Sequence, residues 1–475
     1  MKDETSFTEG RILVPLIRFS VPILLAVFLQ AMYGAVDLLV VGRFGSSASV
    51  SAVSTGSQVM QMVTGIVSGL SVGTTVLIGQ RIGAKDQAGA AKTVGSSIAL
   101  FGPLALVLSA AMMLGAKPFA ALMHAPAQAF GQTVQYILIC SAGILFIVAY
   151  NVISGIFRGI GNSRLPLLFV GIACVCNIAG DFVLVGVFRL DAAGAALATV
   201  LSQAVSVVLS VRIIAKQGMG FAFSRHDIRF CGREIRSILR LGSPIALQDA
   251  MTNLSFLIIT SIINALGLVP SAAIGVSEKV VVFIMLIPIS FMSSVSAFSA
   301  QNIGARKPQR AKKAMLYAMA VSLCFGAPMF ALSFFRGNLL AAIFSTDSQV
   351  IAACAEYMKA YAVDCVLVCV LFCFMGYFNG TGKTMFVMLQ GVLAAFLVRI
   401  PYSYFVSRIP GVSMLQIGFA SPLATIFSLV LCVVYYRRMG KKQAVISAGA
   451  GEDAPDGAED APVGGENAPD GGPQR

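Results

Sequence analysis

The sequence predicts an all-α integral membrane protein with twelve transmembrane helices arranged as two lobes of six. Three observations support this fold class: a strongly apolar composition, twelve long apolar runs, and an internal repeat. Hydrophobic residues make up 57% of the chain and charged residues 12%, and the mean hydropathy is +0.84. Soluble domains carry about 25% charged residues. We therefore expect a multi-pass protein of the plasma membrane, with the lipid bilayer as its surroundings.

Each apolar run is long enough to cross the membrane as a helix. At ~1.5 Å per residue, roughly 20 residues span a hydrocarbon core of ~30 Å. A membrane β-barrel would instead show ~10-residue segments of alternating polarity. The polar start MKDETSFTEG precedes a long apolar run without a small-residue cleavage site, so we expect the first run to be retained. The expected helices span residues 12–41, 51–78, 94–116, 133–157, 165–188, 192–214, 243–266, 272–299, 314–334, 351–377, 385–406 and 414–436.

The basic residues indicate which side of the membrane each loop faces. Cytoplasmic loops are enriched in Lys and Arg. With the N-terminus in the cytoplasm, 26 of the 34 Lys and Arg residues fall on the inner side, five in outer loops and three inside helices. Both termini are therefore expected in the cytoplasm. The net charge of +13 then reflects topology, and we expect no nucleic-acid partner because no basic and aromatic platform is present.

The chain repeats itself at offsets of 221 to 226 residues, which indicates a duplicated unit. Each copy holds six expected helices. Because six is even, both copies share one orientation and are expected to be related by a pseudo-twofold axis along the membrane normal. The matching segments are SVPILL (20–25) with SPIAL (243–247), QRIGAK (80–85) with QNIGAR (301–306), FRGIGNS (157–163) with FNGTGKT (378–384), and ALATV (196–200) with PLATI (422–426).

The repeat divides the chain into four parts. These are an N-terminal six-helix lobe (1–214), a cytoplasmic linker (215–242), a C-terminal six-helix lobe (243–442) and an acidic, Pro/Gly-rich tail (443–475). The tail has no apolar face to bury, so we expect it to be disordered.

Two motifs that resemble a cofactor site and a metal site are better explained as structural elements of the helices and turns. GTGKT at 380–384 resembles a phosphate-binding loop, but Tyr377 occupies the position of the required glycine. Cys365, Cys369 and Cys373 form a helical stripe, and small packing residues explain it better than metal ligands, since both histidines lie in predicted loops. We expect no cofactor and no enzyme activity.

Asp37 stands out within the apolar stretch QAMYGAVDLLVVG at 30–42. It lies six residues before Arg43, or ~9 Å inside the outer end of the first helix. An unpaired carboxylate at that depth costs at least a few kcal/mol, so it should face a wet cavity or be protonated part of the time. Gln30 and Tyr33 precede Asp37 by seven and four residues and share its helical face.

A second polar stripe lies on the fifth and sixth expected helices. Asn177 and Asp181 are one turn apart, and Asp181 is eight residues, or ~12 Å, from Arg189 at the outer side. Thr199 lies eight residues past the outer-loop Asp191, at a similar depth of ~12 Å. We therefore expect Asp37, Asn177, Asp181 and Thr199 to converge as an ion- or proton-coupling site. The alternative is that these residues hydrogen-bond helices together.

The second lobe does not repeat these acids. It has instead Asp249, the Glu278 and Lys279 pair, Asp364 and Arg399. Since acids and cations nearly balance there, internal salt bridges are the favoured interpretation. The residues that we nominate for a substrate cavity are Gln30, Tyr33, Asp249, Asp364 and Arg399.

The two-times-six layout, the acid in VDLLVVGRFG, the NIAGD segment of the fifth helix and the paired GQRIGA and AQNIGA loops resemble the multidrug and toxic compound extrusion (MATE) transporters of bacteria. This resemblance implies a V-shaped twelve-helix fold, alternating access between the lobes, and export of organic, often cationic, compounds driven by inward H⁺ or Na⁺. It also implicates Asp37, Asn177 and Asp181 in coupling, with Na⁺ as a candidate ligand of those three. Some branches of the family add a seventh-helix acid for Na⁺, and Asp249 lies near that place.

We therefore expect a monomeric secondary antiporter for multidrug (xenobiotic) efflux, with a small molecule and H⁺ or Na⁺ as its ligands. Neutralising the acids allows the first lobe to close, because burying ionised acids is costly. The alternative is a flippase of related fold for lipid-linked substrates. Such a flippase should line its pathway with basic residues, whereas the first lobe is acidic.

Overall fold

The computed structural model describes residues 7–452, apart from the side chains of 225 and 441–452. The described part of the chain consists of helices and their connections, with no strand, which confirms the all-α prediction. The described residues fall into two compact units, which divide between Val430 and Leu431. Eleven described helices are long and apolar enough to cross a membrane, and a bent pair makes twelve, six in each lobe.

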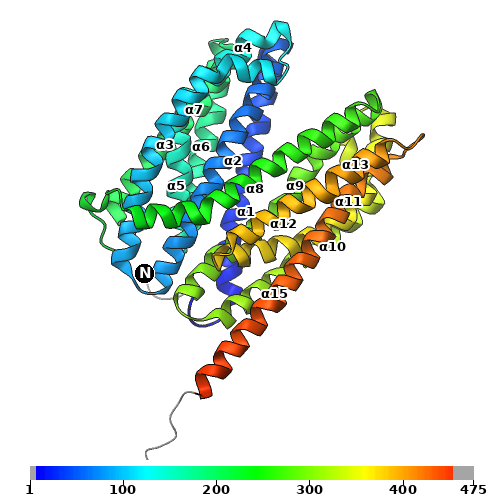
Figure 1. Cartoon of the computed structure of the whole chain (residues 1–475). Coiled ribbons are helices and arrows are strands. Elements are labelled where there is room, and N and C mark those ends of the chain that lie inside the picture. Colours follow the sequence, from blue (N-terminus) through cyan, green and yellow to red (C-terminus); the bar gives the residue numbers. More distant parts are fainter. Residues whose placement is uncertain (1–6, 453–475) are drawn as a thin grey trace, which may run out of the picture. The chain divides into compact units, whose positions relative to one another are not determined.

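The first lobe contains the helices of residues 13–217 (Figure 1). They are α1 (Leu13–Phe44), α2 (Ser47–Gly83), α3 (Gln87–Leu122), α4 (Ala127–Ala142), α5 (Ile144–Ile160), α6 (Arg164–Asp181), the π-helical η1 (Phe182–Val187) and α7 (Asp191–Gln217). The second lobe follows a connection that includes the 3₁₀ turn η2 (Arg225–Asp227). Its helices are α8 (Gly232–Asn264), α9 (Leu268–Gly304), α10 (Pro308–Ala342), α11 (Ser348–Gly380), α12 (Thr384–Leu393), the π-helical η3 (Ala394–Arg399), α13 (Ile400–Ser407), α14 (Met414–Gly418) and α15 (Ala420–Glu452).

The helices depart from the expected spans at three places. The fourth span is bent by 52° at Gly143, between α4 and α5. The fifth and eleventh spans contain the π-helical segments η1 and η3, which hydropathy does not signal. The last helix continues to Glu452, ten residues into the segment assigned to the acidic tail. Residues 453–475 of that tail lie outside the described part of the chain.

Helix α8 begins eleven residues before the expected span and so takes up part of the segment assigned to the linker. Its first turns carry polar residues, which is why an apolar-run criterion stops short of them. Glu234, Ile235 and Ile238 are nevertheless buried there, where α8 packs against α2 and α3 of the first lobe. Further along, α8 packs against α12 of the second lobe (Figure 1). One helix therefore contacts both lobes.

The turns of the two copies have the same backbone geometry. Lys85 and Arg306, at an offset of 221 residues, both have left-handed φ angles, of 59° and 57°. Gly161 and Gly382, at the same offset, have φ angles of 95° and 77° in the turns after α5 and α11. At these two places the repeat in sequence is matched by a repeat in backbone geometry.

The two lobes meet where α2 and α9 end. A Cβ atom on Gly83 would collide with the backbone of Gln301, and one on Gly304 would collide with the backbone of Gln80. Gln80 Nε2 donates a 3.3 Å hydrogen bond to the Gly380 carbonyl, and Gln301 Nε2 donates a 2.9 Å bond to the Gly159 carbonyl. The lobes are thus in close backbone contact at the ends that the positive-inside pattern assigns to the cytoplasm.

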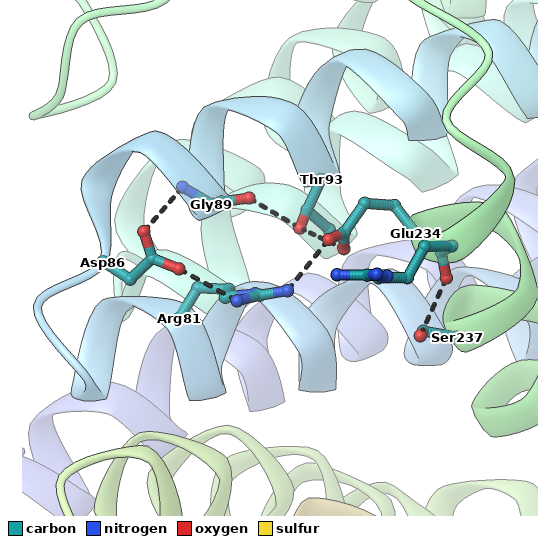
Figure 2. A network of polar contacts seen from close by, with 7 residues as sticks. Arg81, Asp86, Gly89, Thr93, Glu234 and Ser237 are labelled. Carbon is teal, nitrogen blue, oxygen red and sulfur yellow. Dashed lines mark hydrogen bonds and ion pairs between the residues drawn. The ribbon is translucent and has the colours of Figure 1, made fainter.

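An ion-pair network ties the start of α8 to the first lobe at the same end. Figure 2 shows Arg81 of α2 between Asp86 and Glu234, with its guanidinium nitrogens 2.9 and 2.8 Å from their carboxylate oxygens. Thr93 of α3 donates a 3.1 Å bond to the second oxygen of Glu234. Glu234 is buried, and its place in the first turn of α8 is favourable for a negative charge.

Candidate functional site

The predicted coupling residues of the first lobe lie on three neighbouring helices. Asp37 is on α1, Asn177 and Asp181 are on α6, and Thr199 is on α7; α6 packs against both of the others. Asp181 is the last residue of α6, directly before the π-helical segment η1. Asp37, Asn177 and Asp181 are buried, with exposures of 5%, 1% and 0%.

The structure brings these four side chains together. Asn177 Nδ2 donates a 3.4 Å hydrogen bond to Thr199 Oγ1. The carboxyl group of Asp37 faces Asp181, Asn177 and Thr199, so the two acids are direct neighbours. The depths counted along the sequence therefore predict the convergence correctly.

The group is rich in acceptors and poor in donors. Four of its buried oxygens have no hydrogen-bond partner among the described residues: Asp37 Oδ1, Asn177 Oδ1 and both carboxylate oxygens of Asp181. Neither acid has a Lys, Arg or His nitrogen within 4.0 Å in the described part of the chain. Two neighbouring carboxylates without a cation are costly to bury in ionised form. The geometry therefore favours a bound proton or small cation at this place.

Helix α4 adds residues that the sequence analysis missed. Tyr136 and Cys140 are buried one turn apart, and Tyr136 lies close enough to Asp37 and Tyr33 for electrostatic interaction with both. Gly56 of α2 is covered by the Tyr136 ring, which leaves no room for a side chain there. The four-residue spacing of Tyr136 and Cys140 places them on one helical face, but it does not mark them as site residues, because neither is charged and both residue types are common in apolar helices. We name Asp37, Asn177, Asp181, Thr199 and Tyr136 the acid cluster.

The predicted cavity residues of α1 separate into two places. Tyr33 lies beside Asp37. Gln30, one helical turn further from Asp37, lines a different polar cavity together with Asn151, Ser154 and Arg158. The single polar stripe expected on this helix therefore serves two sites.

The expectation of internal salt bridges in the second lobe is wrong for the three acids that carried it, of which only Asp364 is buried. Asp249, Glu278 and Asp364 have no cationic nitrogen within 4.0 Å among the described residues. Glu278 instead accepts a 3.0 Å hydrogen bond from Thr260. Composition alone shows balanced charges but not their separation, and separation decides whether a pair forms.

Asp364 and Arg399 come near each other without pairing. Asp364 lies beside Thr425 and within electrostatic range of Arg399, and its Oδ1 atom has no hydrogen-bond partner among the described residues. The Arg399 guanidinium lies 5.0 Å from the centre of the Phe256 ring, within the range of a cation–π contact. Asp249 on α8 is partly buried and makes no hydrogen bond to the described residues.

Comparison with known proteins identifies similar chains. The MatE family model matches residues 22–183 and 244–405, one block in each lobe. A probable multidrug resistance protein of Bacillus subtilis, YpnP, is 26% identical over 432 residues, which cover 91% of this chain and 96% of the relative. The multidrug export protein MepA of Staphylococcus saprophyticus is 24% identical over 401 residues, or 83% and 88% of the two chains. A solved MATE structure in complex with MaL6 superposes with a TM-score of 0.87 at 19% identity and covers 94% of this chain and 100% of its own.

Proposed function

Since the chain belongs to the MatE family, whose members are transporters and not enzymes, we propose that it is a secondary antiporter that exports organic compounds, lipophilic cations among them, in exchange for inward H⁺ or Na⁺. The observation that carries the proposal is the acid cluster. It holds two buried neighbouring acids, four unpartnered oxygens and no basic partner among the described residues.

The cluster suits a coupling cation. Carboxyl, amide and hydroxyl oxygens are the ligands that hard cations take in proteins, and the same carboxyl pair holds a proton equally well. Had a Lys or Arg neutralised Asp37 and Asp181, the acids would carry a constant charge and no ion would be needed. Their isolation from such partners is what makes the charge of the first lobe depend on a bound ion.

Coupling follows from this dependence. When the cluster faces the outside it takes up H⁺ or Na⁺, and the loss of negative charge weakens the hold of the first lobe on a cationic compound, which leaves outward. The neutralised cluster can then be enclosed at tolerable cost and release its ion inside. The empty, charged cluster attracts the next cationic compound from the cytoplasm. The ion and the compound must disfavour each other's binding to the first lobe, because ligands that bound independently would not be exchanged for one another.

Efflux from proteoliposomes tests the proposal. The lipophilic cation ethidium is loaded, and H⁺ and Na⁺ gradients are imposed or collapsed separately. We expect efflux with only one of the two gradients and its loss in Asp37→Asn. The control is Glu356→Gln, which alters an exposed acid of α11 that makes no hydrogen bond to the described residues and should transport like the wild type. Efflux that ignores both gradients, or an active Asp37→Asn protein, would refute the proposal.

A further inference from the structure

A second polar cavity lies within the first lobe, away from the acid cluster. It is bounded by α1, α2, α5 and α6 and has a volume of about 80 Å³. Room of that size holds a few water-sized groups. Its polar lining consists of Gln30, Ser68, Tyr150, Asn151, Ser154, Arg158 and Ser163. Arg158 is the one charged residue of this lining.

Arg158 has no anionic partner in the described part of the chain. No carboxylate lies within 4.0 Å of it, and no hydrogen bond joins it to a described residue. Arg81 and Arg310 show the usual situation: Arg81 pairs with two carboxylates, and Arg310 donates to backbone carbonyls. A partly buried guanidinium without a partner is costly, and an anion in the cavity would offset that cost.

The fold of the turn does not require this cation. The repeat places Asn379 of the second lobe at the position of Arg158, since FRGIG corresponds to FNGTG. Both copies nevertheless form the same left-handed turn, at Gly161 and at Gly382. The positive charge is therefore a property of the first-lobe cavity and not of the turn.

The neighbouring groups add hydrogen-bond donors to the charge. Ser154 Oγ is buried, with the residue 4% exposed, and lacks a hydrogen-bond partner within the described part of the chain. The Tyr150 hydroxyl lies beside Ser154 and Gln30, and Arg158 lines the same cavity within electrostatic range of it. A guanidinium, two hydroxyl groups and an amide around a cavity without a carboxylate form a donor set for an anion.

We propose that this cavity binds a small monovalent anion through Arg158, Ser154 and Tyr150. The anion is the carboxylate of a transported compound or a free chloride ion. Gln30 and Asp37 are seven residues apart on α1, or ~10 Å along the helix. A compound with a cationic group and a carboxylate at that separation would match both the acid cluster and this cavity. The substrate form of the proposal rests on the proposed transport function; the anion site itself does not.

Equilibrium binding of two matched dyes tests the site. Rhodamine 110 carries a free carboxylate, and rhodamine 123 is its methyl ester with the same cationic ring system. Fluorescence anisotropy is measured with the full chain in lipid nanodiscs and no gradient. We expect Arg158→Gln to weaken binding of rhodamine 110 about 10-fold or more, in line with the loss of a charged hydrogen bond, and to change binding of the ester less than about 2-fold. Arg158→Lys should restore most of the loss.

A second arm separates the two sources of the anion. The titrations are repeated with chloride replaced by the bulky isethionate ion. If the carboxylate of the dye occupies the cavity, chloride competes only with rhodamine 110, and only in proteins with a charge at 158. If free chloride is the ligand, both dyes bind the wild type differently in the two salts, and Arg158→Gln removes the difference. Either result supports the site.

Two results would overturn the proposal. One is an equal loss of both dyes in Arg158→Gln with no salt effect, which would assign Arg158 a purely structural role. The other is unchanged binding of both dyes in both salts. Size-exclusion profiles and thermal unfolding of each variant show whether it is folded. Failure of the transport function is distinct, since it would appear as absent gradient-driven efflux while dye binding still depends on Arg158.

Discussion

Gln301 of α9 donates a 2.9 Å hydrogen bond to the carbonyl of Gly159 on α5, and its repeat counterpart Gln80 donates a 3.3 Å bond to Gly380 on α11. Each bond crosses from one lobe to the other. Together they form a pseudo-symmetric pair at the helix ends assigned to the cytoplasm. The proposed alternating access requires these ends to separate, so under that proposal we expect both bonds to break in every transport cycle.

Removing one bond of this pair should favour separation of the lobes. Each neutral hydrogen bond contributes about 1 kcal/mol, so Gln301→Ala should raise the open population about 5-fold. Hydrogen exchange of peptides that cover 79–86 and 300–307 should become faster by a similar factor. Gln217→Ala, at the exposed end of α7, is the control and should leave exchange unchanged. Unchanged exchange in Gln301→Ala would show that the bond does not hold the lobes together.

The glycines beside this pair should not tolerate a methyl group. The added Cβ of Gly304→Ala would collide with the backbone of Gln80, which is fixed by its own helix. Overpacking of this kind costs about 1–3 kcal/mol, so we expect a lower unfolding temperature. Gly275→Ala on the same helix is the control, because its Cβ would meet open space. Equal unfolding temperatures of the two variants would contradict the close approach.

The Arg81–Glu234 pair should stabilise the docking of α8 on the first lobe. Glu234→Gln keeps the shape but removes the charge, and because Arg81 is 35% exposed we expect a loss of about 1–3 kcal/mol. Thermal unfolding in detergent measures it, and a double-mutant cycle with Arg81→Gln should show non-additive losses. Arg236→Gln changes an exposed residue of the same helix and serves as the control. Additive losses in the cycle would mean that the pair contributes nothing of its own.

Much of this architecture is predicted by the lengths of the apolar runs and the spacing of residues in the sequence. The apolar runs predict the helices, and the offset of 221 residues predicts that Lys85 and Arg306 occupy equivalent turns. Depth along each helix also predicts that Asp37, Asn177 and Asp181 meet, since residues at one depth on packed helices are close in space.

Other features depend on distances that a sequence does not contain. The bend at Gly143 and the π-helical segment after Asp181 leave the hydropathy unchanged. Among the described residues, the missing salt bridges of Asp249, Glu278 and Asp364 and the unpaired guanidinium of Arg158 both depend on separations of a few ångströms. Tyr136 was missed because an aromatic residue in an apolar helix is ordinarily a packing residue.

In the proposed mechanism the acid cluster exchanges its cation for the transported compound. Ion release reports this exchange when ethidium binds to the purified protein in a weakly buffered solution without a gradient. We expect about one H⁺ or one Na⁺ to be released per ethidium bound, and no release from Asp37→Asn or Asp181→Asn. Binding without ion release in the wild type, or undiminished release in both variants, would contradict the account.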